Sequence, residues 1–182
     1  MPAAATASFA PDTTIGGGAG RLTVLLGDEQ DAGEPWHQTA VGLLGAQGIE
    51  TLVARTGRDA LERLEQAALG DGPRIHVAVL EQAMADMSAL QVLRRLRERL
   101  AEMASTSGQS SACPTPPPAI LLAQPSAREG GLNSGLMHDA LTVSVFSVLP
   151  KPVDTNQLLD TLARAMRRHY AGRWPEGRKE KG

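Results

Sequence analysis

Short apolar runs alternate with helix-like stripes along most of the chain. The runs lack regular polar alternation, which is typical of strands buried on both faces of a parallel sheet. Five such runs are present, at residues 22–26, 49–54, 75–80, 119–122 and 145–149. Leucine and alanine at helical spacing follow each run, so the pattern predicts a strand–helix unit repeated five times.

Capping residues support the helical part of this prediction. Thr56 has Asp59 three positions later, Asp154 has Gln157 three positions later, and Ser88 precedes a leucine stripe. Alternating strands and helices with right-handed connections imply an α/β fold. We therefore expect a doubly wound, five-stranded parallel sheet with helices on both faces.

Segments poor in large apolar residues flank and interrupt the pattern. Residues 1–20 consist mainly of Ala, Thr, Gly and Pro, and we expect a disordered N-terminal arm. The Pro- and Ser-rich stretch 103–117 is expected to be a flexible insertion. Residues 171–182 are expected to form a C-terminal tail, too short for a helix-turn-helix output domain. One domain is thus predicted over 21–170.

Polar residues follow three of the predicted strands, at the edge where doubly wound sheets bind ligands. Asp28 and Glu29 follow the first strand, Glu81 the third and Lys151 the fifth. Carboxylates on neighbouring strand ends could share Mg²⁺, which prefers oxygen ligands, and a lysine could hold a phosphoryl oxygen. Without further context, solvated loop positions explain the same residues more simply.

The order of these elements and polar residues resembles the receiver domain of bacterial response regulators, the CheY-like superfamily. The resemblance is strongest over Val77–Arg97 (VAVLEQAMADMSALQVLRRLR) and Phe146–Leu162 (FSVLPKPVDTNQLLDTL). In the second stretch, Lys151-Pro152 precedes an acid-capped leucine helix. The resemblance implies a flavodoxin-like receiver topology, a cis bond before Pro152, and a role in two-component signal transduction.

On each of the third, fourth and fifth strands, one position departs from the pattern that the resemblance implies. Glu81 stands at the phosphoacceptor position, and its side chain is one methylene longer than the usual aspartate. Ala123 replaces the hydroxyl residue at the end of the fourth strand, and Val148 replaces the aromatic switch residue on the fifth. The nucleophile, the hydroxyl contact and the switch are therefore all altered.

The acid pair after the first strand is incomplete as well. It aligns best with Gly27 and Asp28, whereas a shift of one residue pairs Asp28 with Glu29. The resemblance therefore implies a degenerate pseudo-receiver whose Asp28 and Glu81 form at most a weak Mg²⁺ site, with no other cofactor. The residues of the degenerate phosphoacceptor pocket are Asp28, Glu29, Glu81, Ala123 and Lys151.

The function implied is signalling by protein–protein contact without phosphorylation and without enzymatic activity. The partner is a histidine kinase, a phosphotransfer protein or a second copy, bound by the fourth helix, the fifth strand with Val148, and the last helix at 154–170. Glu81 either mimics a phosphorylated residue or belongs to a retired pocket. One alternative is an active receiver phosphorylated on Glu81 or Asp28 with Mg²⁺. Another is a small-ligand-binding flavodoxin-like protein.

Composition excludes several other classes. The single Cys113 rules out a disulfide framework, and His37, His76 and His138 are too dispersed for metal ligation and predict packing or solvent roles. A net charge of -2 and 3% aromatic residues argue against nucleic-acid binding. No stretch approaches the roughly 20 apolar residues of a membrane span and no secretory signal is visible, so we expect a cytoplasmic protein without membrane contact.

Overall fold

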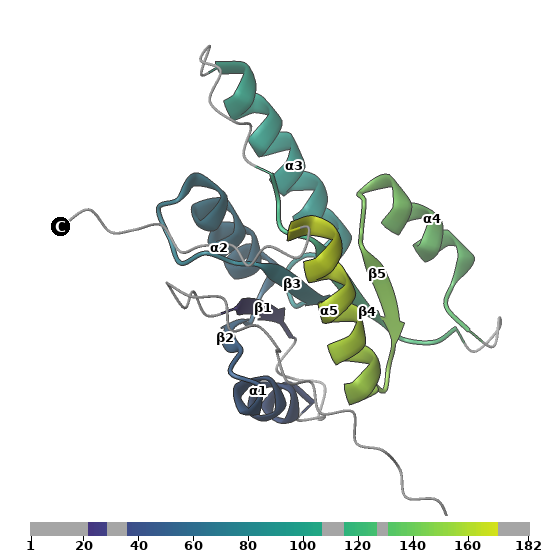
Figure 1. Cartoon of the computed structure of the whole chain (residues 1–182). Coiled ribbons are helices and arrows are strands. Elements are labelled where there is room, and N and C mark those ends of the chain that lie inside the picture. The colour runs from purple at the N-terminus through teal and green to yellow at the C-terminus, as the bar shows by residue number, and fades with distance from the viewer. Residues whose placement is uncertain (1–21, 29–35, 107–114, 127–130, 171–182) are drawn as a thin grey trace, which may run out of the picture.

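Strands and helices alternate along the chain in a computed structural model that describes residues 22–28, 36–106, 115–126 and 131–170. The five strands are β1 (Thr23–Gly27), β2 (Glu50–Ala54), β3 (Val77–Glu81), β4 (Ala119–Ala123) and β5 (Ser147–Pro150). The five helices are α1 (Trp36–Ala46), α2 (Gly57–Leu69), α3 (Ala89–Thr106), α4 (Ser134–Thr142) and α5 (Thr155–Tyr170). Each predicted strand–helix unit is present (Figure 1).

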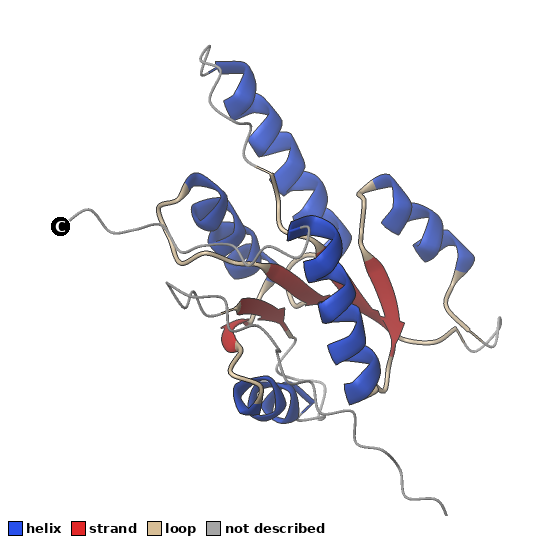
Figure 2. Cartoon of the chain, viewed as in Figure 1, coloured by secondary structure: helices blue, strands red, loops and turns tan. Residues whose placement is uncertain are grey.

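The strands form one parallel sheet in the order β2-β1-β3-β4-β5. The order reverses between β1 and β3, and at such a point the loops at the carboxyl ends of the strands diverge. Figure 2 shows helices on both sides of the sheet. The predicted doubly wound α/β fold is therefore confirmed.

The two faces of the sheet pack against different helices. Alternate residues of a strand point to opposite faces, so β3 gives Ala78 and Leu80 to one core and Val77 and Val79 to the other. Helices α2, α3 and α4 cover the first face, and α1 and α5 cover the second (Figure 1). By this alternation the side chain of Glu81 points toward the face covered by α1 and α5.

The predicted helix caps are present. The hydroxyl oxygen of Thr56 accepts a hydrogen bond from the Asp59 backbone N–H at 3.1 Å, and the carboxylate of Asp154 accepts one from Gln157 N–H at 2.8 Å. Ser88 accepts from the next turn of α3 in the same way. Because caps satisfy backbone donors with nearby side chains, their sequence signatures predicted these helix starts correctly.

One predicted boundary is wrong. Helix α3 continues to Thr106, through the first residues of the segment 103–117 that was expected to be a flexible insertion. Leu100 is its last buried leucine, and residues 101–105 are exposed. The strong helix formers Ala, Glu and Met favour continuation of the helix beyond the apolar stripe, which the end of that stripe could not indicate.

The other predicted segments fall mostly outside the residues that the structure describes. The arm 1–20, the tail 171–182 and residues 107–114 of the insertion are outside the described residues. Among the helices that the structure describes, none is both long and apolar enough to cross a membrane.

Candidate functional site

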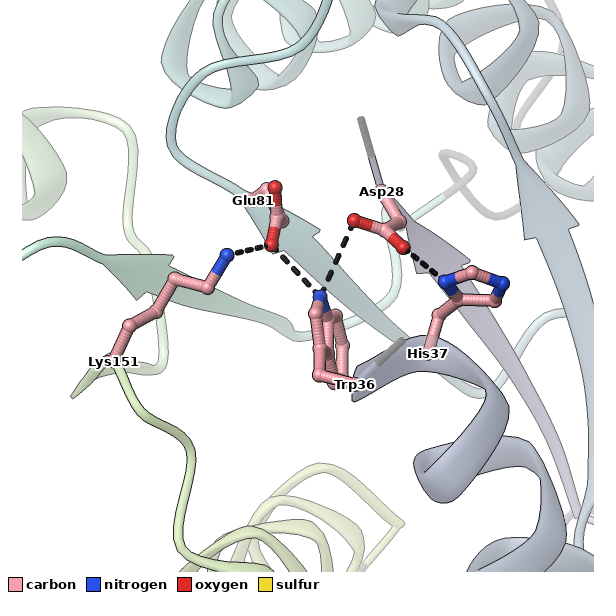
Figure 3. A network of polar contacts seen from close by, with 5 residues as sticks. All are labelled: Asp28, Trp36, His37, Glu81 and Lys151. Carbon is pink, nitrogen blue, oxygen red and sulfur yellow. Dashed lines mark hydrogen bonds and ion pairs between the residues drawn. The ribbon is translucent and has the colours of Figure 1, made fainter. Parts of the chain in front are cut away.

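A buried polar cluster lies at the carboxyl edge of the sheet, on the side covered by α1 and α5. Asp28 directly follows β1, Glu81 ends β3, and Lys151 directly follows β5. All three continue the strand positions that face α1 and α5, so their side chains converge (Figure 3). Asp28 and Glu81 are each 5% exposed and Lys151 is 9% exposed. These three residues were predicted to lie in one pocket, and the structure brings their side chains together.

Glu81 contacts the other residues of the cluster through one carboxylate oxygen. Its Oε1 accepts a hydrogen bond from the Lys151 ammonium, with which it also forms a buried ion pair. The same atom accepts a hydrogen bond from the indole N–H of Trp36 at 2.8 Å. A buried carboxylate is costly unless its charge is paired and hydrogen bonded, and both conditions are met here.

Asp28 is held from the other side of the cluster. Its Oδ1 accepts a second, longer hydrogen bond from the Trp36 indole N–H at 3.2 Å. Its Oδ2 lies 2.6 Å from Nδ1 of His37, an ion pair when the imidazole is protonated, although the contact lacks the alignment of a directed hydrogen bond. Burial and the neighbouring charge of Glu81 raise the pKa of Asp28, against the opposing effects of His37, Trp36 and Lys151.

Trp36 and His37 are functional candidates that the sequence pattern missed. Trp36 fitted the apolar spacing of the first helix, and the histidines were expected to have packing or solvent roles, which is wrong for His37. Both residues open α1, and the start of a helix that follows a parallel strand lies over the carboxyl edge of the sheet (Figure 3). Polar side chains in the first helical turn after Asp28 were therefore the available signal.

At the end of β1, two core side chains crowd the position of the first member of an acid pair. A Cβ atom built on Gly27 would lie 2.7 Å from Cδ2 of Leu80 and 3.1 Å from the sulfur of Met84. An aspartate at this position would therefore require the neighbouring core to move. Asp28 enters the cluster under either alignment, whereas Glu29 lies outside the described residues.

The other two predicted site positions surround the cluster without joining its polar contacts. Ala123 is fully buried and packs on the sheet face opposite to that of Glu81, while its carbonyl oxygen accepts a hydrogen bond from the Lys151 backbone N–H at 2.9 Å. The following bond, Lys151–Pro152, is cis, as the resemblance implies. Val148 is half-buried against the core beneath α3 and α4. Neither Ala123 nor Val148 offers a polar side-chain group.

The cluster does not fit a divalent cation. Three of the four carboxylate oxygens of Asp28 and Glu81 already face Trp36, His37 or Lys151. Mg²⁺ requires oxygen ligands in octahedral geometry, and in proteins one or two of these ligands are usually carboxylate oxygens. Across the described ranges, no group of three or more His, Cys, Asp and Glu side chains is arranged to hold a metal ion. The donors and a cation would compete for the same atoms.

Comparisons with known proteins identify the fold through structure. No protein-family model matches the chain. No curated protein matches its sequence either. Among solved structures, the chemotaxis protein CheY4 of Vibrio cholerae is similar with a TM-score of 0.58 at 19% identity, covering 80% of this chain and 99% of that one.

Two further solved structures support the same assignment. A response regulator receiver protein of Pseudomonas putida has a TM-score of 0.56 at 20% identity, covering 80% of this chain and 98% of that one. A two-component response regulator of Clostridium difficile has a TM-score of 0.59 at 16% identity, covering 81% and 98%. Together with the β2-β1-β3-β4-β5 sheet, these matches show that the chain has the fold of a response-regulator receiver domain.

Proposed function

We propose that this chain is a receiver-like module of two-component signal transduction that acts through protein–protein contact without being phosphorylated. The observation that carries the proposal is the state of Glu81, which stands at the phosphoacceptor-equivalent position. Its Oε1 is engaged by both Lys151 and Trp36 within a buried cluster. The carboxylate therefore serves the internal structure of the pocket.

Phosphoryl transfer depends on positioning and on electrostatic stabilisation of the transferred group. Here the indole N–H of Trp36 donates hydrogen bonds to the carboxylates of Asp28, which follows β1, and of Glu81, which ends β3. Ala123 has no hydroxyl to bond a phosphoryl oxygen, and Gly27 has no carboxylate. Three separate contributions to the reaction are absent or engaged, which supports a function independent of phosphorylation.

The same contacts bear on whether Glu81 imitates a phosphorylated residue. Its charge is buried and compensated within the molecule by Lys151. A partner at the surface would meet little of that charge, because a closely paired opposite charge cancels most of its field. We infer that the pocket is retired and that the module has no catalytic activity of its own.

The partner-binding surface that we propose is the face formed by α4, β5 and α5. Met137 and Leu141 lie one turn apart on α4 and are 39% and 73% exposed, so two large apolar side chains adjoin on one exposed helix face. Val148 lies on β5, the strand that follows α4 in the chain, and its side chain is half-buried. The partner is a cytoplasmic signalling protein, such as a histidine kinase or a phosphotransfer protein, or a second copy of the chain.

The test of phosphorylation independence uses the full chain and a small phosphodonor. The protein is incubated with acetyl phosphate and Mg²⁺, and its intact mass is measured beside an active receiver domain as a positive control. We expect no gain in mass for this chain, because the carboxylate of Glu81 is engaged. A stoichiometric gain of one phosphoryl group would falsify the proposal, and its loss in the variant Glu81→Gln or Asp28→Asn would identify the modified acid.

A further inference from the structure

A single indole N–H lies between two carboxylates in the pocket. Trp36 Nε1 is 2.8 Å from Glu81 Oε1 and 3.2 Å from Asp28 Oδ1, so one donor is shared by both acids (Figure 3). Two carboxylates brought together at strand ends repel each other, and the pKa of Asp28 is raised partly by Glu81. A group with positive potential is needed between them, and the indole N–H supplies it.

The Lys151 ammonium and the His37 imidazole flank the two acids from either side. Lys151 pairs with Glu81, and His37 contacts the far oxygen of Asp28. Trp36, His37 and Lys151 thus reach the two acids from α1 and from the end of β5, in an arc around them (Figure 3). A divalent cation bridging the acids would have to displace the indole from the same oxygens.

Trp36 is held in place by the helix that carries it. It opens α1, whose Ala40 and Leu44 are buried against the sheet, and its own side chain packs on that core. Moving the indole away from the acids would therefore also break its own contacts with this core. A side chain fixed in this way excludes a competing ligand more effectively than a mobile one, because it has little freedom to retreat.

We propose that Trp36, with Lys151 and His37, takes the place of a bridging divalent cation, so that the pocket excludes Mg²⁺, and that Trp36 is the residue that decides this. The inference rests on the proposed function and deepens it, since it names the group that closes the pocket. Removal of the indole N–H exposes two neighbouring carboxylates and creates a site that Mg²⁺ can enter.

The experiment compares the full chain with its variant Trp36→Phe, which keeps an aromatic ring and removes the N–H donor. Melting temperature is measured during titration with Mg²⁺ at constant ionic strength, and binding of Mn²⁺ is followed by electron paramagnetic resonance. Trp174→Phe, which removes the only other tryptophan, is the matched control. In this control background the fluorescence comes from Trp36 and reports directly on the pocket.

We expect the wild-type chain and Trp174→Phe to show no melting shift, no fluorescence change and no Mn²⁺ binding at millimolar metal. Trp36→Phe should bind Mn²⁺ and melt at a temperature that rises with Mg²⁺, because a ligand that binds only the folded state stabilises it. Saturable metal binding by the wild-type chain overturns the proposal. So does a folded Trp36→Phe that gains no metal binding.

A second variant covers the case in which the first does not fold. If Trp36→Phe does not fold, the measurements on the wild-type chain still stand, and Trp36→Leu provides a second removal of the donor. The outcome is also separable from that of the proposed function. Wild-type protein that binds Mg²⁺ without taking up a phosphoryl group overturns only the present inference, whereas a phosphorylated chain overturns the proposed function.

Discussion

Two residues of opposite charge, Glu81 and Lys151, are buried together at the end of the sheet. Removing charged groups from water is costly, and their mutual attraction compensates only while both partners are present. The loss of one partner therefore leaves an uncompensated charge in the core. This makes the pair sensitive to single substitutions and less sensitive to joint replacement.

The pair predicts a specific double-mutant result. Glu81→Gln keeps the size of the side chain and removes the charge opposite Lys151, so we expect a loss of about 2 kcal/mol in the free energy of unfolding. The remaining charge of Asp28 moderates this loss, because it lies in the same cluster. Lys151→Met in the Glu81→Gln background should restore part of the stability, as measured by urea denaturation.

The control for this cycle is Glu98→Gln, which changes an exposed glutamate on α3. We expect it to be close to neutral, since exposed charges contribute little. If Glu81→Gln is as stable as the wild-type chain, or if the two pocket substitutions simply add, the buried pair is not energetically coupled and this account of the pocket is wrong.

At the scale of elements, the start of α2 is fixed by a contact from a different part of the chain. The Asp86 carboxylate, in the loop after β3, accepts hydrogen bonds from the backbone N–H groups of Gly57 at 2.6 Å and Arg58 at 3.1 Å. Gly57 lies so close that a Cβ there would be 2.3 Å from Cγ of Met87. The loop after β3 is thereby joined to the first turn of α2.

This contact predicts the effect of Asp86→Ala. The substitution removes an anionic acceptor from a helix N-terminus, so we expect a loss of about 1 kcal/mol in unfolding free energy. Although burial opposes it, hydrogen bonding from Arg58 and Gly57 lowers the pKa of Asp86. The contribution of the cap is thus present at neutral pH and is lost as the pH falls through the lowered pKa.

Urea denaturation at neutral and acid pH checks this expectation, with Asp160→Ala as the control because Asp160 is an exposed aspartate on α5. The stability difference between wild-type and Asp86→Ala should shrink in acid. A difference that is absent at neutral pH, or that does not change with pH, contradicts a charged cap at α2.

The elements also show why sequence patterns found some contacts and not others. The cap formed by Thr56 and Asp59 joins residues three apart, so its signature is local and was recognised. Asp86 caps a residue 29 positions earlier, and Trp36 meets Glu81 across 45 positions. Such contacts depend on which loops the sheet order brings together, and periodicity contains no information about that order.

For the whole molecule, the receiver fold gives two very different surfaces. At the carboxyl edge, the acids are closed over by Trp36, His37 and Lys151. On α4, by contrast, large apolar side chains remain exposed. Strand runs and helix stripes were enough to predict the sheet, and the resemblance to receiver domains implied a docking face that includes this helix. They could not show that the pocket is closed by α1, because that depends on how Trp36 packs.

The exposed apolar side chains of α4 could bind a second copy of the chain. If a second copy of the chain docks there, Leu141→Glu places a charge at the centre of an apolar contact, and we expect self-association to weaken at least tenfold, about 1.4 kcal/mol. Sedimentation velocity over a range of concentrations measures this. Leu69→Glu is the matched control, because Leu69 on α2 is 40% exposed and lies outside the proposed face. Equal weakening by both substitutions, or a wild-type chain that stays monomeric throughout, would show that α4 does not bind a second copy.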